Sequence, residues 1–295
     1  MKSKKLASVL ALMVTAWMVS SCEKMVLSES AKSEEAAGAN VVLRVASFEM
    51  EEFGHATRAD IADLCSRLTF VVYNDEGEKL KTVLQKEGDS DFGAVSMTLA
   101  EGDYNLCVFA HSSNGNPSLS DLSKIKFENK MGFSDTFHYF GRLSVGESKQ
   151  EVKLKLKRIT SLFRFIITDD FPSNVTKLNF RYTGGSGAFD AATGYGSVKS
   201  QQSVDFSIDG NQKQFDLYTI LWEDTAKLKF TVTAYDASGE AVKQQEFTDV
   251  PMQRNMITKY TGSFFSGTSS SGSSEGFSFV LEVEGEWGGE QSYRN

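Results

Sequence analysis

Alternation of apolar and polar residues is the main pattern in this chain, and it predicts strands. Two runs, residues 41–48 and 67–73, are rich in β-branched or aromatic residues and place an apolar side chain at every second position. In the first run Val41, Leu43 and Val45 share one side, which we expect to face a core. Further short runs follow, separated by turn signals, and no segment has a long helical period. The pattern therefore predicts an all-β protein.

The strands group into two sets. About seven short runs lie between residues 41 and 157, which suits one antiparallel sandwich. One of them begins Gly102-Asp103-Tyr104, and we expect the Tyr104 hydroxyl to bond a backbone group. A short helix is expected near Leu119–Lys124. A second set starts at Ser161 almost without a linker, so residues 158–295 should form a second, stiffly joined sandwich.

The first 40 residues predict export and lipid attachment. Residues 1–21 have a basic start, an apolar run and small residues before a cut, as in a secretory signal. Val19-Ser20-Ser21-Cys22 looks like a bacterial lipobox, which would place an acyl chain such as palmitate on Cys22 and hold the protein on a bilayer. A plain signal peptide with a chance Cys is the alternative. Residues 22–40 lack periodicity and indicate a flexible tether.

The net charge bears on the kind of partner, and the cysteines bear on a possible disulfide. The formal net charge is −8, which argues against a nucleic-acid partner. Cys65 and Cys107 lie at or near predicted strands. In an oxidising envelope they either form a disulfide or remain two small buried core residues.

No catalytic constellation is present in the sequence. The three His residues, His55, His111 and His138, lie in separate segments without metal-ligand spacing. Thr183–Gly187 is Gly-rich but lacks the Gly-Lys-Ser/Thr ending of a phosphate loop, so we interpret it as a tight loop between strands. We expect no catalytic residue, no cofactor, no metal and no enzymatic activity.

The order of several short motifs resembles the fimbrillin and fimbrial-subunit superfamily of Bacteroidetes, over nearly the whole chain. Besides the lipobox and tether, Thr57-Arg58-Ala59 looks like the site at which an Arg-specific protease matures such pilins. The other matching segments are Leu68–Asn74, Arg158–Phe165, Gln253-Arg254-Asn255 and Glu284-Gly285-Glu286-Trp287.

This resemblance implies a fold, a location and a mode of assembly. The fold would be two tandem antiparallel β-sandwiches of transthyretin-like, Greek-key type. The protein would be an outer-membrane lipoprotein at the cell surface or in the fimbrium, supporting adhesion. Cleavage between Arg58 and Ala59 would free the first strand, and the groove left behind would accept a strand donated by another fimbrial subunit. Shaft, anchor and tip roles all stay open, as does a host protein or glycan receptor.

A second function class is a surface lipoprotein that binds glycans. Such proteins display aromatic rings on loops, and Trp222 is the one candidate because Trp17 lies in the signal and Trp287 on a predicted strand. An extracellular hydrolase, a third class, has no residue constellation behind it.

Overall fold

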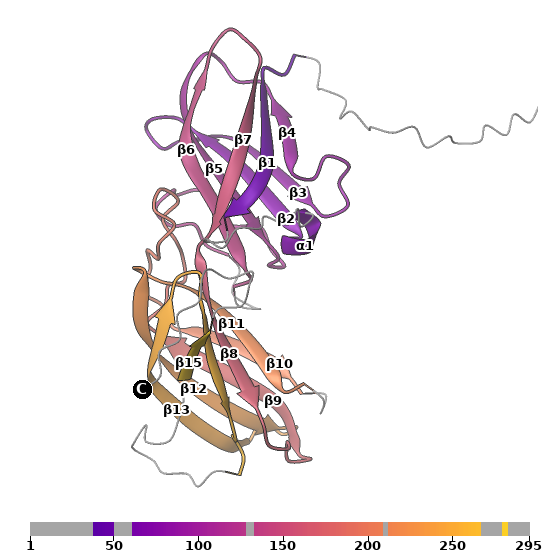
Figure 1. The fold of residues 1–295 in the computed structure, drawn as a ribbon, viewed down its shortest axis with the longest axis vertical. Helices are drawn as coiled ribbons and strands as arrows, with labels where there is room; N and C mark the ends of the chain where they lie inside the picture. Colours follow the sequence, from indigo (N-terminus) through magenta and orange to yellow (C-terminus); the bar gives the residue numbers. More distant parts are fainter. Residues whose placement is uncertain (1–37, 50–60, 128–132, 209–211, 267–278, 283–295) are drawn as a thin grey trace, which may run out of the picture. The chain divides into compact units, whose positions relative to one another are not determined.

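The regular secondary structure of the described residues is almost entirely strand (Figure 1). The computed structural model describes residues 38–49, 61–127, 133–208, 212–266 and 279–282. The chain divides into the units Met1–Glu34 and Glu35–Asn295, and every described residue belongs to the second. Among the described residues, 60% are in strands and 2% in helix, so the prediction of an all-β protein is confirmed.

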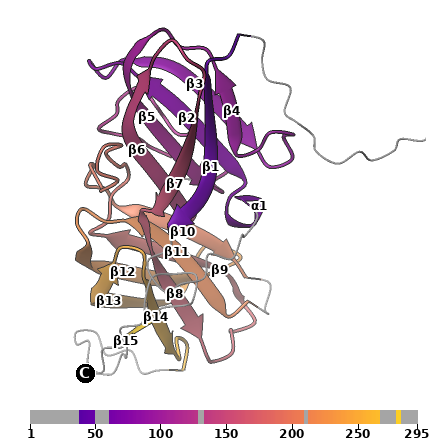
Figure 2. The same cartoon turned by 45° about the horizontal axis from the view of Figure 1, so that its top comes forward.

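The first seven strands form one sheet in the order β3-β2-β5-β6-β7-β1-β4. β6 and β7 pair only through Phe137 with Arg158 and His138 with Lys157. The sheet therefore folds at this corner into two layers, β3-β2-β5-β6 and β7-β1-β4, which face each other (Figure 2). The strands are β1 (Val41–Glu49), β2 (Arg67–Tyr73), β3 (Lys79–Lys86), β4 (Ala94–Met97), β5 (Gly102–His111), β6 (Thr136–Val145) and β7 (Gln150–Arg158).

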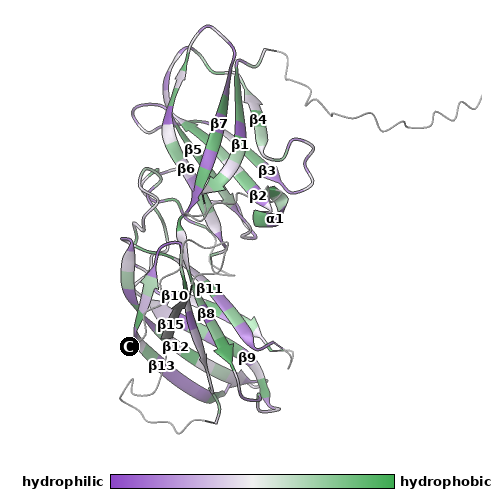
Figure 3. Ribbon diagram, in the orientation of Figure 1, coloured by the Kyte–Doolittle hydropathy of each residue, from purple (hydrophilic) through white to green (hydrophobic). Residues whose placement is uncertain are grey.

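Alternating side chains from both layers build the first core, and green and purple bands follow one another along these strands in Figure 3. In β5 the inward side chains include Leu106, Val108 and Ala110, each no more than 1% exposed. The Tyr104 hydroxyl donates a hydrogen bond to the Ala100 carbonyl at 2.9 Å, so the expected backbone partner is confirmed.

The remaining strands form two four-stranded sheets, β10-β9-β12-β13 and β11-β8-β14-β15, around an aromatic core. In that core Phe165 stacks on Tyr260 with ring centroids 4.6 Å apart. The strands are β8 (Thr160–Ile167), β9 (Val175–Thr183), β10 (Gln202–Ser207), β11 (Gln214–Ile220), β12 (Thr225–Asp236), β13 (Ala241–Gln253), β14 (Ile257–Gly262) and β15 (Phe279–Glu282).

Two features differ from the sequence-based expectation. The pairs β1/β7 and β14/β8 are parallel, while the other neighbours are antiparallel. The prediction of a short helix near Leu119–Lys124 is wrong. There Asp121 accepts hydrogen bonds from the backbone and hydroxyl of Ser123 and closes a turn to Lys124, a local pattern that competes with helix. A four-residue helix, α1 (Ile61–Leu64), precedes β2 instead.

The connection between the two sets of strands is a single residue. β7 ends at Arg158 and β8 begins at Thr160, so Ile159 alone joins them. The assignment of residues 41–157 and 158–295 to two separate domains stays a prediction.

Candidate functional site

β1 is a central strand of its layer, although it comes first along the chain. It runs parallel to β7, from Val41 opposite Gln150 to Glu49 opposite Lys157, and antiparallel to β4. We name the space between β7 and β4 that β1 fills the β1 slot. Because a central strand satisfies backbone groups on both neighbours, losing β1 would leave two open strand edges.

The inward side chains of β1 are fully part of the first core. Val41 and Leu43 are 0% exposed and Val45 is 5% exposed, so their predicted orientation is confirmed. Burying each such side chain contributes roughly 1.5–3 kcal/mol. The ordering of the strand opposes this gain, but an uncut chain should still hold β1 firmly in the slot.

A β-bulge changes the pattern after Val45. The ladder with β7 passes from Val45 directly to Ser47, so Ala46 has no partner residue. Strict alternation would turn Ser47 inward and Phe48 outward. With the extra residue Phe48 packs on the core instead, edge-on to Phe137 with ring centroids 4.8 Å apart.

Asn40 anchors the start of β1. Its side-chain amide donates to the Leu99 carbonyl at 2.8 Å and its Oδ1 accepts from the Leu99 N–H at 3.0 Å. Its backbone N–H donates to Met97 O, and its carbonyl accepts from Gln150 N–H. Asn40 was expected to end a flexible tether. Sequence reasoning missed this role because its partners lie about 60 and 110 residues away in the chain.

On the outward side of β1, Val42 is half-buried and Arg44 is exposed. Arg44 Nε lies 3.2 Å from Glu151 Oε1 on β7, and both side chains are about half exposed. Such exposed pairs contribute at most about 1 kcal/mol. The stability of the filled slot therefore comes from its inward side and its backbone ladders.

The predicted lipidation and processing residues, Cys22, Arg58 and Ala59, lie outside the described residues. Two described neighbours bracket the processing site: β1 ends at Glu49 and α1 begins at Ile61. A cut after Arg58 would therefore fall between β1 and every other strand of the protein.

Cys65 and Cys107 are both free and buried. Cys65 belongs to the cluster inside the first sandwich, whereas Cys107 points to the opposite face of the sheet and packs in another cluster. A disulfide between them would have to cross the sheet, so the structure matches two buried core residues rather than a bonded pair. Burial raises the pKa of the Cys65 thiol to about 12 and that of Cys107 well above its usual value.

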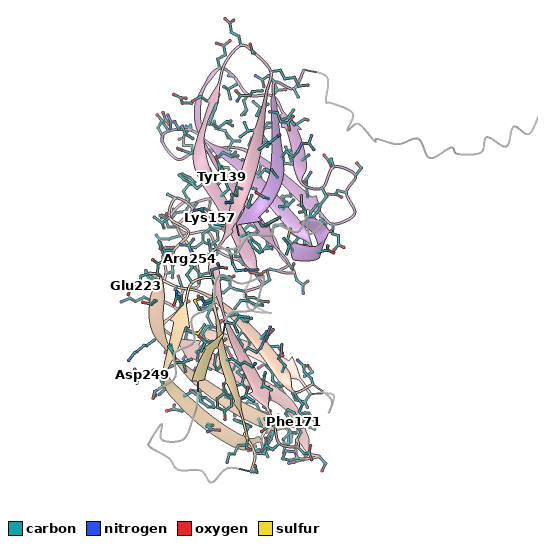
Figure 4. The ribbon with its side chains drawn as sticks, in the orientation of Figure 1. Tyr139, Lys157, Phe171, Glu223, Asp249 and Arg254 are labelled. Atoms are coloured by element: carbon teal, nitrogen blue, oxygen red, sulfur yellow. The ribbon has the colours of Figure 1, made fainter. Side chains whose placement is uncertain are left out.

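A buried ion pair holds the junction between the strand sets. The Arg158 guanidinium donates to both carboxylate oxygens of Asp135, and its own side chain is 2% exposed. It also donates to Asn255 Oδ1 at 3.1 Å and lies over the Phe137 ring. Arg254, labelled in Figure 4, stacks its guanidinium on the Tyr195 ring next to this junction. Two segments that carry the family resemblance thus meet here, 97 residues apart in sequence.

His111, His138 and the Gly-rich segment, considered above for metal or phosphate binding, lie in buried or hydrogen-bonded surroundings. Burial lowers the pKa of both His111 and His138 to about 4, which keeps the two rings neutral at pH 7. The described part of the chain holds no cluster of His, Cys, Asp or Glu suited to a metal ion. The Ser186 hydroxyl accepts hydrogen bonds from Ser197 and Val198 N–H groups, so the Gly-rich segment is the tight loop that we expected.

Trp222 is a poor platform for a sugar ring. Its side chain is half-buried, and its indole N–H donates to the Gly185 carbonyl at 3.4 Å. Within the described ranges, no helix is long and apolar enough to cross a membrane.

Comparisons with known proteins place the chain in a family. The model of a family of unknown function (DUF6562) matches residues 33–292. No curated protein matches the chain.

Solved structures with a similar arrangement of strands come from Bacteroides and Porphyromonas species. A candidate polysaccharide-binding protein (DUF1812) from Bacteroides thetaiotaomicron has 13% identity and a TM-score of 0.49, covering 87% of this chain and 98% of its own. The fimbrial anchor protein Mfa2 from Porphyromonas gingivalis has 10% identity and a TM-score of 0.42, covering 75% and 89%. The tip fimbrial protein Mfa3 from the same organism, with a C-terminal truncation, has 10% identity and a TM-score of 0.39, covering 75% and 93%. With TM-scores below 0.5, these likenesses carry no functional argument.

Proposed function

This chain belongs to the family of unknown function DUF6562, and we propose that it serves as a structural subunit of a cell-surface fimbria. In this proposal it is exported as a lipoprotein precursor, supports adhesion, and assembles with other fimbrial subunits by strand exchange in the β1 slot.

The observation that carries the proposal is the position of β1. It is central in its layer and buries Val41, Leu43 and Val45, yet a cut at one place in the chain would separate it from all other strands. The emptied slot would expose the inner residues of β7 and β4 together with their backbone edges. A donated strand with the same spacing of apolar residues would regain both the burial and the ladders.

The donor must meet two geometric demands. It has to run parallel to β7 and antiparallel to β4, as β1 does. It also needs apolar side chains at three alternate positions, corresponding to Val41, Leu43 and Val45. A donor of the wrong register would turn its apolar side chains to solvent.

Lipid attachment at Cys22 gives the precursor its place at the outer membrane. The lipid and β1 both precede Arg58, so a cut there would release the remaining strands from the membrane together with an open slot. A subunit that stays uncut would keep its lipid and its own strand, as an anchor would.

Limited trypsin digestion tests the assembly proposal. We expect a fragment that begins at Ala59 by N-terminal sequencing and that forms ladders of oligomers on sizing. The Arg58→Gln variant, which removes the cleavage residue, should remain monomeric under the same conditions. A wild-type Ala59 fragment that stays strictly monomeric after losing β1 would contradict strand exchange.

Metabolic labelling with a fatty-acid analogue tests the lipid separately. The wild-type protein should be labelled and the Cys22→Ala variant should not. Equal labelling of both proteins would contradict lipidation at Cys22.

A structural role also implies that the chain is not an enzyme, and this stays a prediction. A purified sample that turns over a defined substrate, with the activity lost on a single substitution, would overturn it.

A further inference from the structure

The outer face of the sheet β10-β9-β12-β13 carries a shallow polar depression that assembly through the β1 slot does not use. Its volume is about 400 Å³. All four strands contribute to it, and every lining side chain is polar or phenolic. They are Lys177, Asn179, Arg181, Ser203, Asp205, Thr231, Thr233, Tyr235 and Gln244.

Strand register arranges these side chains in rows across the sheet. One row runs from Ser203 through Arg181 and Thr231 to Glu246, whose carboxylate pairs with Lys229. The next runs from Asp205 through Asn179 and Thr233 to Gln244. Neighbouring strands lie about 4.8 Å apart and alternate residues about 6.6–6.8 Å apart. The depression is thus a regular field of hydroxyl, amide and charged groups.

Of the charged side chains in the depression, Lys177 and Asp205 have partners within the described part of the chain and Arg181 does not. Lys177 lies 3.4 Å from Asp205 and above the Tyr235 ring, and Asn179 donates to Asp205 at 2.6 Å. Arg181 is exposed and, among the described residues, its side chain makes no ion pair or hydrogen bond. Its guanidinium can therefore receive a carboxylate in the two-bond geometry that arginine favours.

These properties exclude most ligand classes. Pockets for drug-like molecules and cofactors are mostly apolar and enclosed, unlike this open polar face. An added peptide strand needs an open sheet edge, whereas β9 and β12 at the centre of the depression are paired on both sides. Nucleic acid is bound through several basic side chains along its phosphates, whereas this face has two, Lys177 and Arg181, beside the carboxylate of Asp205. A ligand rich in hydroxyl groups and carrying a carboxylate fits the groups that remain.

We infer that this face binds an acidic glycan, with a sugar carboxylate on Arg181 and sugar hydroxyls on the Thr, Asn and Gln side chains around it. The site goes beyond the proposed assembly function, because it lies on different strands and would be present in a cut or an uncut chain. Uronates and sialic acids share the required chemistry.

Calorimetric titration of the purified protein with defined probes tests this inference. Tetragalacturonate represents uronates, 3′-sialyllactose represents sialic acids, and lactose is the neutral control. We expect saturable binding of at least one acidic probe, with Kd about millimolar or tighter, and no binding of lactose. Arg181→Ala should weaken that binding about tenfold to a hundredfold.

A matched variant separates recognition from general charge attraction. Lys153→Ala removes one positive charge from an exposed position on β7, outside the depression, and should leave the affinity unchanged. Thermal melting should show that both variants stay folded, because both side chains are exposed. The inference is overturned if neither acidic probe binds the wild-type protein, if Arg181→Ala binds as the wild type does, or if Lys153→Ala loses as much affinity. None of these results would bear on strand exchange.

Discussion

Each set of strands contains a strand that lies between a parallel and an antiparallel neighbour. These two strands, β14 and β1, differ in how the chain on either side of them is held. β14 lies between β8, to which it is parallel, and β15, to which it is antiparallel. β1 lies in the same way between β7 and β4. Both strands are deeply buried: Ile257 in β14 is 1% exposed and Leu43 in β1 is 0% exposed.

The tethers distinguish the two strands. β14 follows β13 through a turn in which Asn255, with φ of 58°, bonds both Thr160 and Arg158. Beyond its other end, the Asp169 carboxylate accepts hydrogen bonds from the backbone N–H groups of residues 264–266. At its start β1 is held by the hydrogen bonds of Asn40 and by one from the Thr98 hydroxyl to the Gly38 carbonyl, and its chain link to β2 contains the predicted cut. In the proposed exchange, the connections of a strand rather than its burial would decide whether it can leave its slot.

The largest expected loss of stability comes from the Asp135–Arg158 ion pair, which holds Asn255 at the start of β14. Asp135→Ala would leave the buried Arg158 guanidinium without its carboxylate and should lower the free energy of unfolding by about 3–5 kcal/mol. Glu151→Ala, which breaks the exposed pair with Arg44, should cost no more than about 1 kcal/mol. Urea unfolding of both variants measures the difference, and equal effects would argue against a rigid tether.

Matched core truncations compare the two slots directly. Leu43→Ala and Ile257→Ala should each lower the free energy of unfolding of the intact protein by about 2–5 kcal/mol. After cleavage at Arg58 and removal of β1, only Ile257→Ala should still lower the free energy of unfolding. The Ala59 fragment itself lacks residue 43. If the fragment prepared from the Leu43→Ala protein is less stable than the one prepared from wild type, β1 has stayed bound in the slot after the cut.

The anchor of β1 should have a smaller effect. Asn40→Ala removes two hydrogen bonds to Leu99 and should lower the free energy of unfolding by about 1–3 kcal/mol. Amide hydrogen exchange should show faster opening of β1 while β14 is unaffected. Unchanged exchange in β1 would mean that Asn40 does not anchor it.

The smallest effect should depend on pH. Burial acts to raise the pKa of Asp169, but hydrogen bonds from the three backbone N–H groups and from the Ser266 side chain together outweigh it, and the net pKa lies below the usual 3.8. Since the folded pKa is the lower one, this stabilisation is complete above the usual carboxyl pKa and is lost as pH falls through the folded pKa. Asp169→Asn should therefore cost about 1 kcal/mol at pH 7. Denaturant curves of variant and wild type should converge near pH 2, and a constant gap at both pH values would contradict this.

Short-range pattern was enough to predict the strands but not their neighbours. Alternation identified the inward residues Val41, Leu43 and Val45, because burial on one face imposes a period of two. It did not reveal the bulge at Ala46, which depends on how β7 accommodates one extra residue. Parallel pairing of β1 with β7 was equally hidden, since it joins strands about 100 residues apart.

The candidate site was predictable to a similar degree. The notion of a removable first strand followed from the order of strand, connection and Arg58 in the sequence. The groups that hold each strand, Asn40 in one slot and Asn255 with Arg158 in the other, were not predictable. Their hydrogen bonds are long-range, and a polar residue at a strand end gives no sign of its partner.

Uptake of a labelled peptide by the cut protein tests strand exchange in the β1 slot most directly. A fluorescent peptide of residues 38–49 is added in excess to protein cut after Arg58 and to intact protein, and bound label is measured after gel filtration. The account predicts that the cut protein takes up about one peptide per chain, that intact protein takes up none, and that a Leu43→Asp peptide fails to bind. Equal uptake by cut and intact protein, or no uptake by the cut protein, would contradict exchange in the β1 slot.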